Sequence, residues 1–141
     1  MKKFLVVFFA LLLILSTALL KNSTKRIDDE IFLIKENKKI LIGLARLMFI
    51  DFKSKVTELG IYIGEKKYMG LGLGTKALRL LIIKAFSNLK LRKIFLRVNE
   101  KNLSAIKLYK KMNFKIEGVM CENYYNSEKK IFEDVIYMSL F

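Results

Sequence analysis

A glycine-rich segment in the middle of the chain constrains the fold more than any other feature. It reads Gly70-Leu71-Gly72-Leu73-Gly74-Thr75, after an alternating apolar strand at Val56 to Ile63 and before a helical stripe at Thr75 to Asn88. Glycine lets a backbone approach phosphate oxygens closely, and the N–H groups at a helix N-terminus attract anions. The order of strand, glycine loop and helix therefore predicts an anion-binding loop, with a plain turn as the alternative.

The rest of the pattern predicts one domain of the α/β (α+β) class. Short apolar runs between polar turns are typical of strands, and a stripe at i, i+3, i+4 and i+7 is typical of a helix. The expected order is three antiparallel strands, then helix, strand, helix, strand and strand. Besides Val56 to Ile63, the expected strands are Ile31 to Ile34, Ile40 to Ile50, Lys93 to Val98, Phe114 to Met120 and Phe132 to Leu140, and the second helix is Leu103 to Met112.

Several classes of site are excluded by residues that the chain lacks. It has 141 residues, no histidine and one cysteine, Cys121. Ser-His-Asp and Cys-His catalytic pairs, an intramolecular disulfide and a four-cysteine zinc or iron–sulfur site are therefore excluded. The glycine loop lacks the Gly-Lys-Ser/Thr ending of a Walker loop, and no acid that could bind a ribose occurs between Lys66 and Asn99. A bound phosphate thus needs a different cofactor.

The basic residues gather in the middle of the chain. Lys and Arg number 27 against 13 acids, a net charge of +14, and from Gly64 to Lys115 there are 14 basic and 2 acidic residues. This surplus predicts a region that attracts anions, although a proteome rich in lysine produces the same bias. Aromatic residues interleaved with basic ones, at Tyr124 and Tyr125, are too few for base stacking, so we expect no nucleic acid partner.

Two blocks of the sequence carry a resemblance to a known family. The first is Thr57-Glu58-Leu59-Gly60-Ile61-Tyr62-Ile63 followed by Met69 to Ala77, and the second runs from Val98 to Tyr109 and contains Asn-x-x-Ala-x-x-Leu-Tyr. From Ile31 onward, the chain resembles the GNAT superfamily of N-acetyltransferases. An Asp-x-x-x-Met segment, Asp134 to Met138, makes the resemblance greatest to the branch of ribosomal-protein-alanine and amino-sugar N-acetyltransferases.

The resemblance implies a mixed central sheet of about six strands with helices on both faces, preceded by an apolar N-terminal helix. It also implies direct attack of a primary amine on acetyl-CoA, the cosubstrate, without a metal. The acceptor would be a nucleotide-linked amino sugar, a protein N-terminus or a small amine, and the basic surplus disfavours polyamines. Relatives begin with a strand and two helices before the first hairpin, and the short N-terminus here leaves an alternative: a truncated, non-catalytic domain that binds CoA.

The resemblance further assigns roles to residues. The backbone near Ile61 and Ile63 would pair with pantetheine and polarise the thioester carbonyl. Tyr109 would protonate the leaving thiolate, and Glu58 would act as general base, with an ion pair as its alternative role. The expected cofactor-binding residues are Ile61, Ile63, Met69, Gly70, Leu71, Gly72, Leu73, Gly74, Thr75, Asn102 and Tyr109.

Two positions depart from the family pattern. Met69 stands where the family has Gln or Arg, which removes one expected contact with phosphate, and Lys66 or Lys67 is the expected replacement. Asn113 stands where the family has glycine before Phe114, and asparagine tolerates the same left-handed helix cap. The loop and the second helix are therefore expected to keep their shape.

The N-terminal residues Phe4 to Leu20 carry no charge. Three interpretations stay open: a signal peptide, a short membrane helix, and a helix that is buried or packs its apolar face on a sheet. We divide the chain into residues 1–25, an apolar helix with its linker, and residues 26–141, the acetyltransferase-like domain. Because acetyl-CoA is cytosolic, the expected location is the cytoplasm, or a membrane anchor with the domain facing the cytoplasm.

Overall fold

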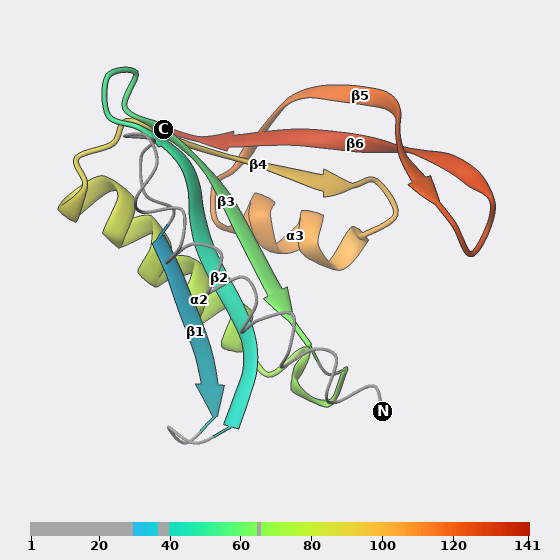
Figure 1. The fold of residues 1–141 in the computed structure, drawn as a ribbon, viewed down its shortest axis with the longest axis horizontal. Helices are drawn as coiled ribbons and strands as arrows, with labels where there is room; N and C mark the ends of the chain where they lie inside the picture. The colour runs from blue at the N-terminus through green and yellow to red at the C-terminus, as the bar shows by residue number, and fades with distance from the viewer. Residues whose placement is uncertain (1–29, 37–39, 65) are drawn as a thin grey trace, which may run out of the picture.

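The computed structural model describes residues 30–36, 40–64 and 66–141. They form a mixed six-stranded sheet in the order β1-β2-β3-β4-β6-β5, with two α-helices (Figure 1). The predicted fold class is therefore confirmed, whereas the predicted N-terminal helix at 1–25 lies outside the described residues. The elements are β1 Glu30–Glu36, β2 Ile40–Asp51, β3 Val56–Ile63, η1 Lys66–Tyr68, α2 Leu73–Ile83 with a π-helical continuation η2 Lys84–Asn88, β4 Lys93–Asn99, α3 Leu103–Lys111, β5 Lys115–Asn126 and β6 Ile131–Leu140.

Most elements have nearly the predicted bounds, and β5 is the main exception. It continues beyond the predicted Met120 to Asn126, in a ribbon with β6 in which Tyr125 lies opposite Phe132. The ribbon extends past the end of β4 (Figure 1), and most of its side chains are exposed. A strand that buries neither face needs no apolar alternation, so the pattern could not predict it.

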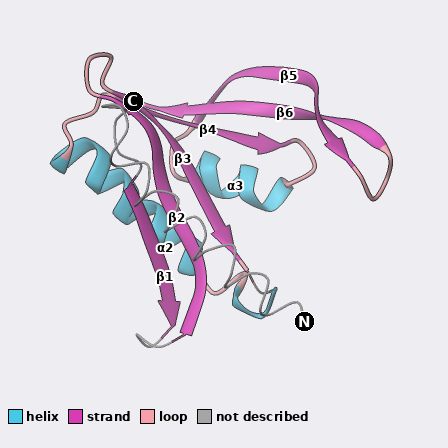
Figure 2. Ribbon diagram, in the orientation of Figure 1, coloured by secondary structure: helices cyan, strands magenta, loops and turns pink. Residues whose placement is uncertain are grey.

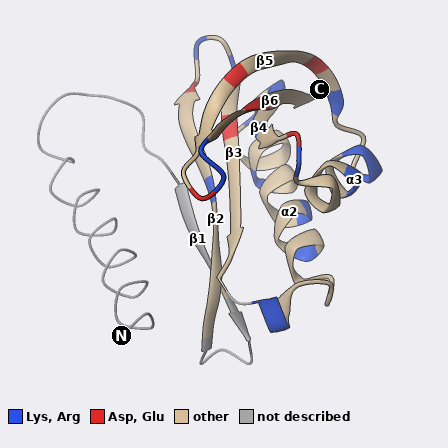
Figure 3. Ribbon diagram, turned by 90° about the vertical axis from the view of Figure 1, so that its right-hand side faces the viewer, with Lys and Arg blue, Asp and Glu red and all other residues tan. Residues whose placement is uncertain are grey.

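Both described helices lie on one face of the sheet (Figure 3). Their apolar stripes meet alternate side chains of the central strands in a single core. The expectation was helices on both faces, and within the described ranges the opposite face carries none. The largest fully buried apolar side chains of the core are those of Leu47, Ile50, Leu78, Leu81, Ile94, Leu96 and Met138.

The parallel strands β3 and β4 separate after a short paired stretch. Their register joins Val56–Glu58 to Lys93–Phe95, and no later residues of the two described strands pair with each other. β3 continues to Ile63 and β4 to Asn99, so the strands open into a V (Figures 1 and 2). The facing edges inside the V therefore carry N–H and C=O groups that are not bonded across the gap.

Asn113, after the end of α3, adopts the predicted left-handed conformation, with φ 67°. Glycine enters this region without strain, whereas a β-branched residue does not. We expect Asn113→Gly to raise the free energy of unfolding by up to about 1 kcal/mol and Asn113→Val to lower it by a similar amount or more. Urea unfolding of the three proteins measures both changes, and a glycine variant less stable than wild type would contradict the assignment.

Candidate functional site

The glycine loop leads into a helix N-terminus whose N–H groups are free. α2 begins at Leu73 rather than at the predicted Thr75, with Gly72 as N-cap at φ 74° and no side-chain cap. The N–H of Lys76 donates to the carbonyl of Gly72 at 3.0 Å. Within the described residues the N–H groups of Leu73, Gly74 and Thr75 donate to no acceptor, and no acid stands in the first turn. This helix N-terminus can therefore accept an anion.

Nothing in the described structure requires position 74 to be glycine. Gly70 and Gly72 adopt positive φ, 79° and 74°, but Gly74 does not. A Cβ added at Gly74 would meet no atom within 4 Å. Glycine in a helix is less favourable than alanine by about 1 kcal/mol, so an unforced glycine here weakens the helix. The empty space beside Gly74 fits a ligand that approaches the backbone closely.

Two exposed lysines lie near Met69, on the elements before and after the glycine loop. The Met69 side chain is 54% exposed, and its N–H already donates to the carbonyl of Lys66 at 3.0 Å. Lys66 on η1 and Lys76 on α2 are both exposed, and Figure 3 shows basic residues on both elements. These two lysines can supply the positive charge that methionine cannot, and a contact of Met69 itself with the cofactor stays a prediction.

Ile61 and Ile63 lie on the part of β3 that has left β4. On its other side this part pairs with β2, where Ala45 and Gly43 are the partners of the two isoleucines. Backbone N–H and C=O groups along a strand point alternately to its two edges. Between Leu59 and Ile63, the groups that do not point toward β2 therefore point into the V. An extended chain with amide groups, such as pantetheine, can add to this edge as a further strand.

Tyr109 on α3 has its ring in the core and its hydroxyl unbonded. The residue is 7% exposed, and its ring centroid lies 5.8 Å from that of Phe114. The hydroxyl forms no hydrogen bond with a described residue. Every fully buried side-chain polar atom in the described part of the chain has a hydrogen-bond partner. The hydroxyl oxygen is therefore not fully buried and is accessible to a ligand or to water. Burial raises the pKa of Tyr109 above the ordinary 10.0, which keeps the group a neutral proton donor at physiological pH.

Asn102 is the N-cap of α3. Its Oδ1 accepts hydrogen bonds from the N–H of Ala105 at 3.2 Å and from the hydroxyl of Ser104 at 3.0 Å. Asparagine before an amphipathic stripe is a strong N-cap signal, so this second role of Asn102 can be inferred from the sequence pattern. The Nδ2 group has no bond to the described residues and can still donate to a cofactor, so the predicted contact with pantetheine stays a prediction.

Glu58, the candidate base, forms an ion pair. The residue is 6% exposed, and Arg97 donates through Nε to Oε1 at 2.9 Å and through Nη2 to Oε2 at 3.1 Å. Hydrogen bonding to this carboxylate raises the pKa of Arg97 above its ordinary value. The ion-pair alternative thus describes the structure, and both carboxylate oxygens are already acceptors. The role of Glu58 as general base stays a prediction.

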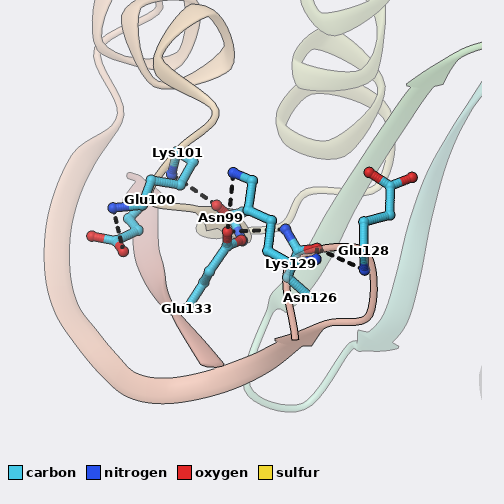
Figure 4. Close-up of polar contacts among 7 residues, drawn as sticks. All are labelled: Asn99, Glu100, Lys101, Asn126, Glu128, Lys129 and Glu133. Carbon is cyan, nitrogen blue, oxygen red and sulfur yellow. Dashed lines mark hydrogen bonds and ion pairs between the residues drawn. The ribbon is translucent and has the colours of Figure 1, made fainter. Parts of the chain in front are cut away.

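A second buried carboxylate, Glu133 on β6, had no sequence signal. The residue is 4% exposed and accepts from Asn99 Nδ2 at 2.7 Å and Asn126 Nδ2 at 3.0 Å, with Lys129 Nζ at 3.8 Å (Figure 4). The hydrogen bond from Asn99 holds the pKa of Glu133 below its ordinary value. Asn99 also accepts from the N–H of Lys101 at 2.8 Å. The cluster thereby fixes the turn between β4 and α3 against the β5–β6 hairpin.

Solved spermidine N-acetyltransferases from Vibrio cholerae share this fold. One variant matches with a TM-score of 0.77 and 26% identity, over 88% of this chain and 72% of that chain. Another, described as dodecameric and in an intermediate state, matches with a TM-score of 0.74 and 27% identity, over 80% of this chain and 64% of that chain. The fold of the described residues is therefore similar to the fold of these enzymes.

Curated proteins with related sequences carry similar names. The spermidine N(1)-acetyltransferase of Escherichia coli is 34% identical over 83 residues, 59% of this chain and 44% of the relative. The spermine/spermidine N(1)-acetyltransferase of Bacillus subtilis is 34% identical over 85 residues, 60% of this chain and 54% of the relative. The chain thus spans about half the length of the curated relatives that it matches.

These relatives do not support the expected branch of ribosomal-protein-alanine and amino-sugar N-acetyltransferases. That expectation depended on Asp134 to Met138, which the structure shows to be a supporting segment. Asp134 accepts from the N–H of Glu122 at 2.8 Å through Oδ1 and from the N–H of Glu100 at 3.0 Å through its carbonyl, and Met138 is fully buried. Such contacts stabilise the sheet and carry no information about the acceptor.

Two further expectations concern a membrane and a metal. No helix in residues 30–36, 40–64 and 66–141 is long and apolar enough to cross a membrane, and the segment proposed as an anchor, Phe4 to Leu20, lies outside these residues. In the same ranges no three His, Cys, Asp or Glu side chains gather as metal ligands would. Location, membrane contact and metal-free chemistry stay predictions.

The family itself is shown by sequence and fold together. Residues 8–114 match the family described as acetyltransferase (GNAT). The matched range contains β3 and β4, which form the V, the glycine loop and α2, which form the free helix N-terminus, and α3 with Tyr109. The chain therefore belongs to the acetyltransferase (GNAT) family.

Proposed function

We propose that this chain is an acetyl-CoA-dependent N-acetyltransferase that acts on the primary amine of a small molecule. The observation that carries the proposal is the V between β3 and β4, followed along the chain by the free N–H groups of Leu73, Gly74 and Thr75. Acetyl-CoA has matching parts, since its diphosphate suits a helix N-terminus and its amide-bearing arm suits a strand edge. Family membership supports the same cosubstrate.

The reaction would run as direct transfer between two bound substrates. The amine nitrogen attacks the thioester carbonyl, and N–H groups at the edge of β3 near Ile61 and Ile63 stabilise the negative oxygen that forms. The C–S bond then breaks, and the hydroxyl of Tyr109 gives its proton to the departing sulfur. The proton of the amine passes to water or to Glu58, and the products are an amide and CoA with a free thiol.

For the acceptor, the names of the relatives support polyamines. Those proteins are named for spermidine or spermine, and none of the named relatives supports an amino sugar or a protein N-terminus. The basic surplus from Gly64 to Lys115 by itself disfavours polyamines. Lys66 and Lys76 beside the glycine loop, however, suit the phosphates of the cofactor and explain part of that surplus. Spermidine and spermine are therefore the first acceptors to test.

One observation favours a second function, a domain that binds CoA without catalysis. Both oxygens of Glu58 accept from Arg97, so the carboxylate at the start of the V is already neutralised. Under this alternative the cofactor binds and no amine is acetylated.

The test is a calorimetric titration with acetyl-CoA, followed by an assay of thiol release with spermidine, spermine and butylamine. We expect binding in the micromolar range and turnover of at least one amine. Binding without turnover of any amine would support the second function. Absence of binding would contradict both functions, because each depends on the loop as a site for CoA.

A further inference from the structure

The amine that reacts in the V has one open approach among the described residues. The core and both helices fill one face of the sheet, and the phosphate site at α2 lies with them (Figure 3). The amine therefore approaches from the opposite face, which we call the acceptor face. It is defined here by paired side chains of β3, β4 and β6, in which Glu58 lies opposite Phe95 and Arg97 opposite Tyr137.

In the Glu58–Arg97 ion pair, the arginine is the residue exposed on the acceptor face. The side chain of Arg97 is 49% exposed and that of Glu58 only 8%. Beside the pair, the rings of Phe95 and Tyr137 stack with centroids 5.0 Å apart. An incoming amine thus meets a guanidinium and two aromatic rings, while the carboxylate that could attract a cation lies beneath the arginine.

The other carboxylates described on this face also have partners. Glu117 accepts from Lys93 Nζ at 2.7 and 2.8 Å and from the hydroxyl of Ser139 at 2.9 Å. Glu133 accepts from two asparagine amides. Among the described residues, Glu58 is the carboxylate at the start of the V, and Arg97 is the group that neutralises it. Arg46, which pairs with Gly60 on the same face, adds a second positive charge, and the charge of Arg97 is the one that directly cancels Glu58.

We propose that Arg97 is a specificity-determining residue: by covering and neutralising Glu58, it weakens binding of amines with several positive charges relative to amines with one. This proposal rests on the proposed function and specifies its substrate class. It predicts that removal of the Arg97 charge, which leaves Glu58 without a cationic partner, shifts the preference of the chain toward amines with several positive charges. Removing one unit charge from a half-exposed site a few ångströms from a ligand cation changes affinity by about fivefold.

The experiment compares spermine with butylamine in wild type, Arg97→Gln and Arg97→Lys. Glutamine can still donate one hydrogen bond to Glu58 but removes the charge, and lysine keeps the charge. We expect the ratio of kcat/KM for spermine to that for butylamine to rise about fivefold in Arg97→Gln and to stay near the wild-type value in Arg97→Lys. Lys107→Gln, on the exposed side of α3, removes the same charge far from the acceptor face and serves as the matched control.

A second variant and a second measurement keep the proposal testable if catalysis or folding fails. Glu58→Gln leaves the charge of Arg97 uncompensated, so the affinity for spermine should fall below that of wild type. Calorimetric titration of the CoA complexes with spermine measures affinity without turnover, and thermal melting checks that each variant is folded. If no amine is acetylated, the proposed function fails while the binding comparison still tests Arg97. Spermine affinities of Arg97→Gln and wild type within twofold of each other would overturn the proposal.

Discussion

Replacement of Tyr109 by phenylalanine is expected to lower kcat by at least about 100-fold, because general acid catalysis by a positioned group contributes rate factors of this size. The affinity for CoA should change by less than about twofold, since the hydroxyl would meet only the sulfur at the end of the cofactor. The ring is 7% exposed and packs against Phe114, and phenylalanine preserves that packing. Thiol release under saturating substrates measures kcat, and calorimetry measures the affinity for CoA.

The matched control for this variant is Tyr125→Phe. Tyr125 is 51% exposed on the β5–β6 ribbon, and loss of its hydroxyl should leave kcat unchanged. A Tyr109→Phe protein with the kcat of wild type would refute the acid role. A Tyr109→Phe protein that loses CoA affinity and kcat together would indicate that the hydroxyl binds the cofactor instead.

The pH dependence offers an independent check on Tyr109. Burial raises the pKa of its hydroxyl above the ordinary 10.0, so the proton-carrying form persists to higher pH than in an exposed tyrosine. Rising pH removes this proton around that raised pKa, so the alkaline decline of kcat should lie at higher pH than it would for an exposed tyrosine. In Tyr109→Phe this alkaline decline should disappear, as a pH profile of kcat can show.

The elements that form the site could be predicted because their signals are local. The alternation from Val56 to Ile63 and the stripe beginning at Leu103 each lie within one stretch of chain, and the structure has β3 and α3 at those places. The turn at Asn113 follows from the tolerance of asparagine for positive φ. Periodicity and turn chemistry need no knowledge of distant residues.

The partners of the polar groups could not be predicted in the same way. Arg97 and Glu58 are 39 residues apart and meet only because β3 and β4 pair in parallel with a particular register. Glu133 likewise accepts hydrogen bonds from two asparagines, one at the end of β4 and one at the end of β5. The expected branch lacks support for a related reason, because Asp134 to Met138, on which it depended, stabilises the sheet through contacts that no local pattern reveals.

Replacement of Gly74 by valine separates the needs of the cofactor from those of the fold. A Cβ at this position would meet no atom within 4 Å, and the φ of Gly74 is not positive, so the fold leaves room for a side chain and the backbone needs no strain. Valine is a slightly better helix former than glycine, and we expect the free energy of unfolding to change by less than about 0.5 kcal/mol. The branched side chain nevertheless fills the space in which a diphosphate would approach the N–H groups of α2.

We therefore expect Gly74→Val to weaken CoA binding by about tenfold or more, while urea unfolding finds it as stable as wild type. The estimate corresponds to the loss of one or two hydrogen bonds from backbone N–H groups to a charged phosphate. Gly118→Val is the matched control, because a Cβ at Gly118 on β5 also meets no atom within 4 Å and lies away from the loop. Equal CoA affinity in both variants and wild type would mean that the loop is a plain turn, the alternative that the glycine pattern left open. A loss confined to Gly74→Val would show that position 74 is kept as glycine for the ligand, at the expense of helix stability.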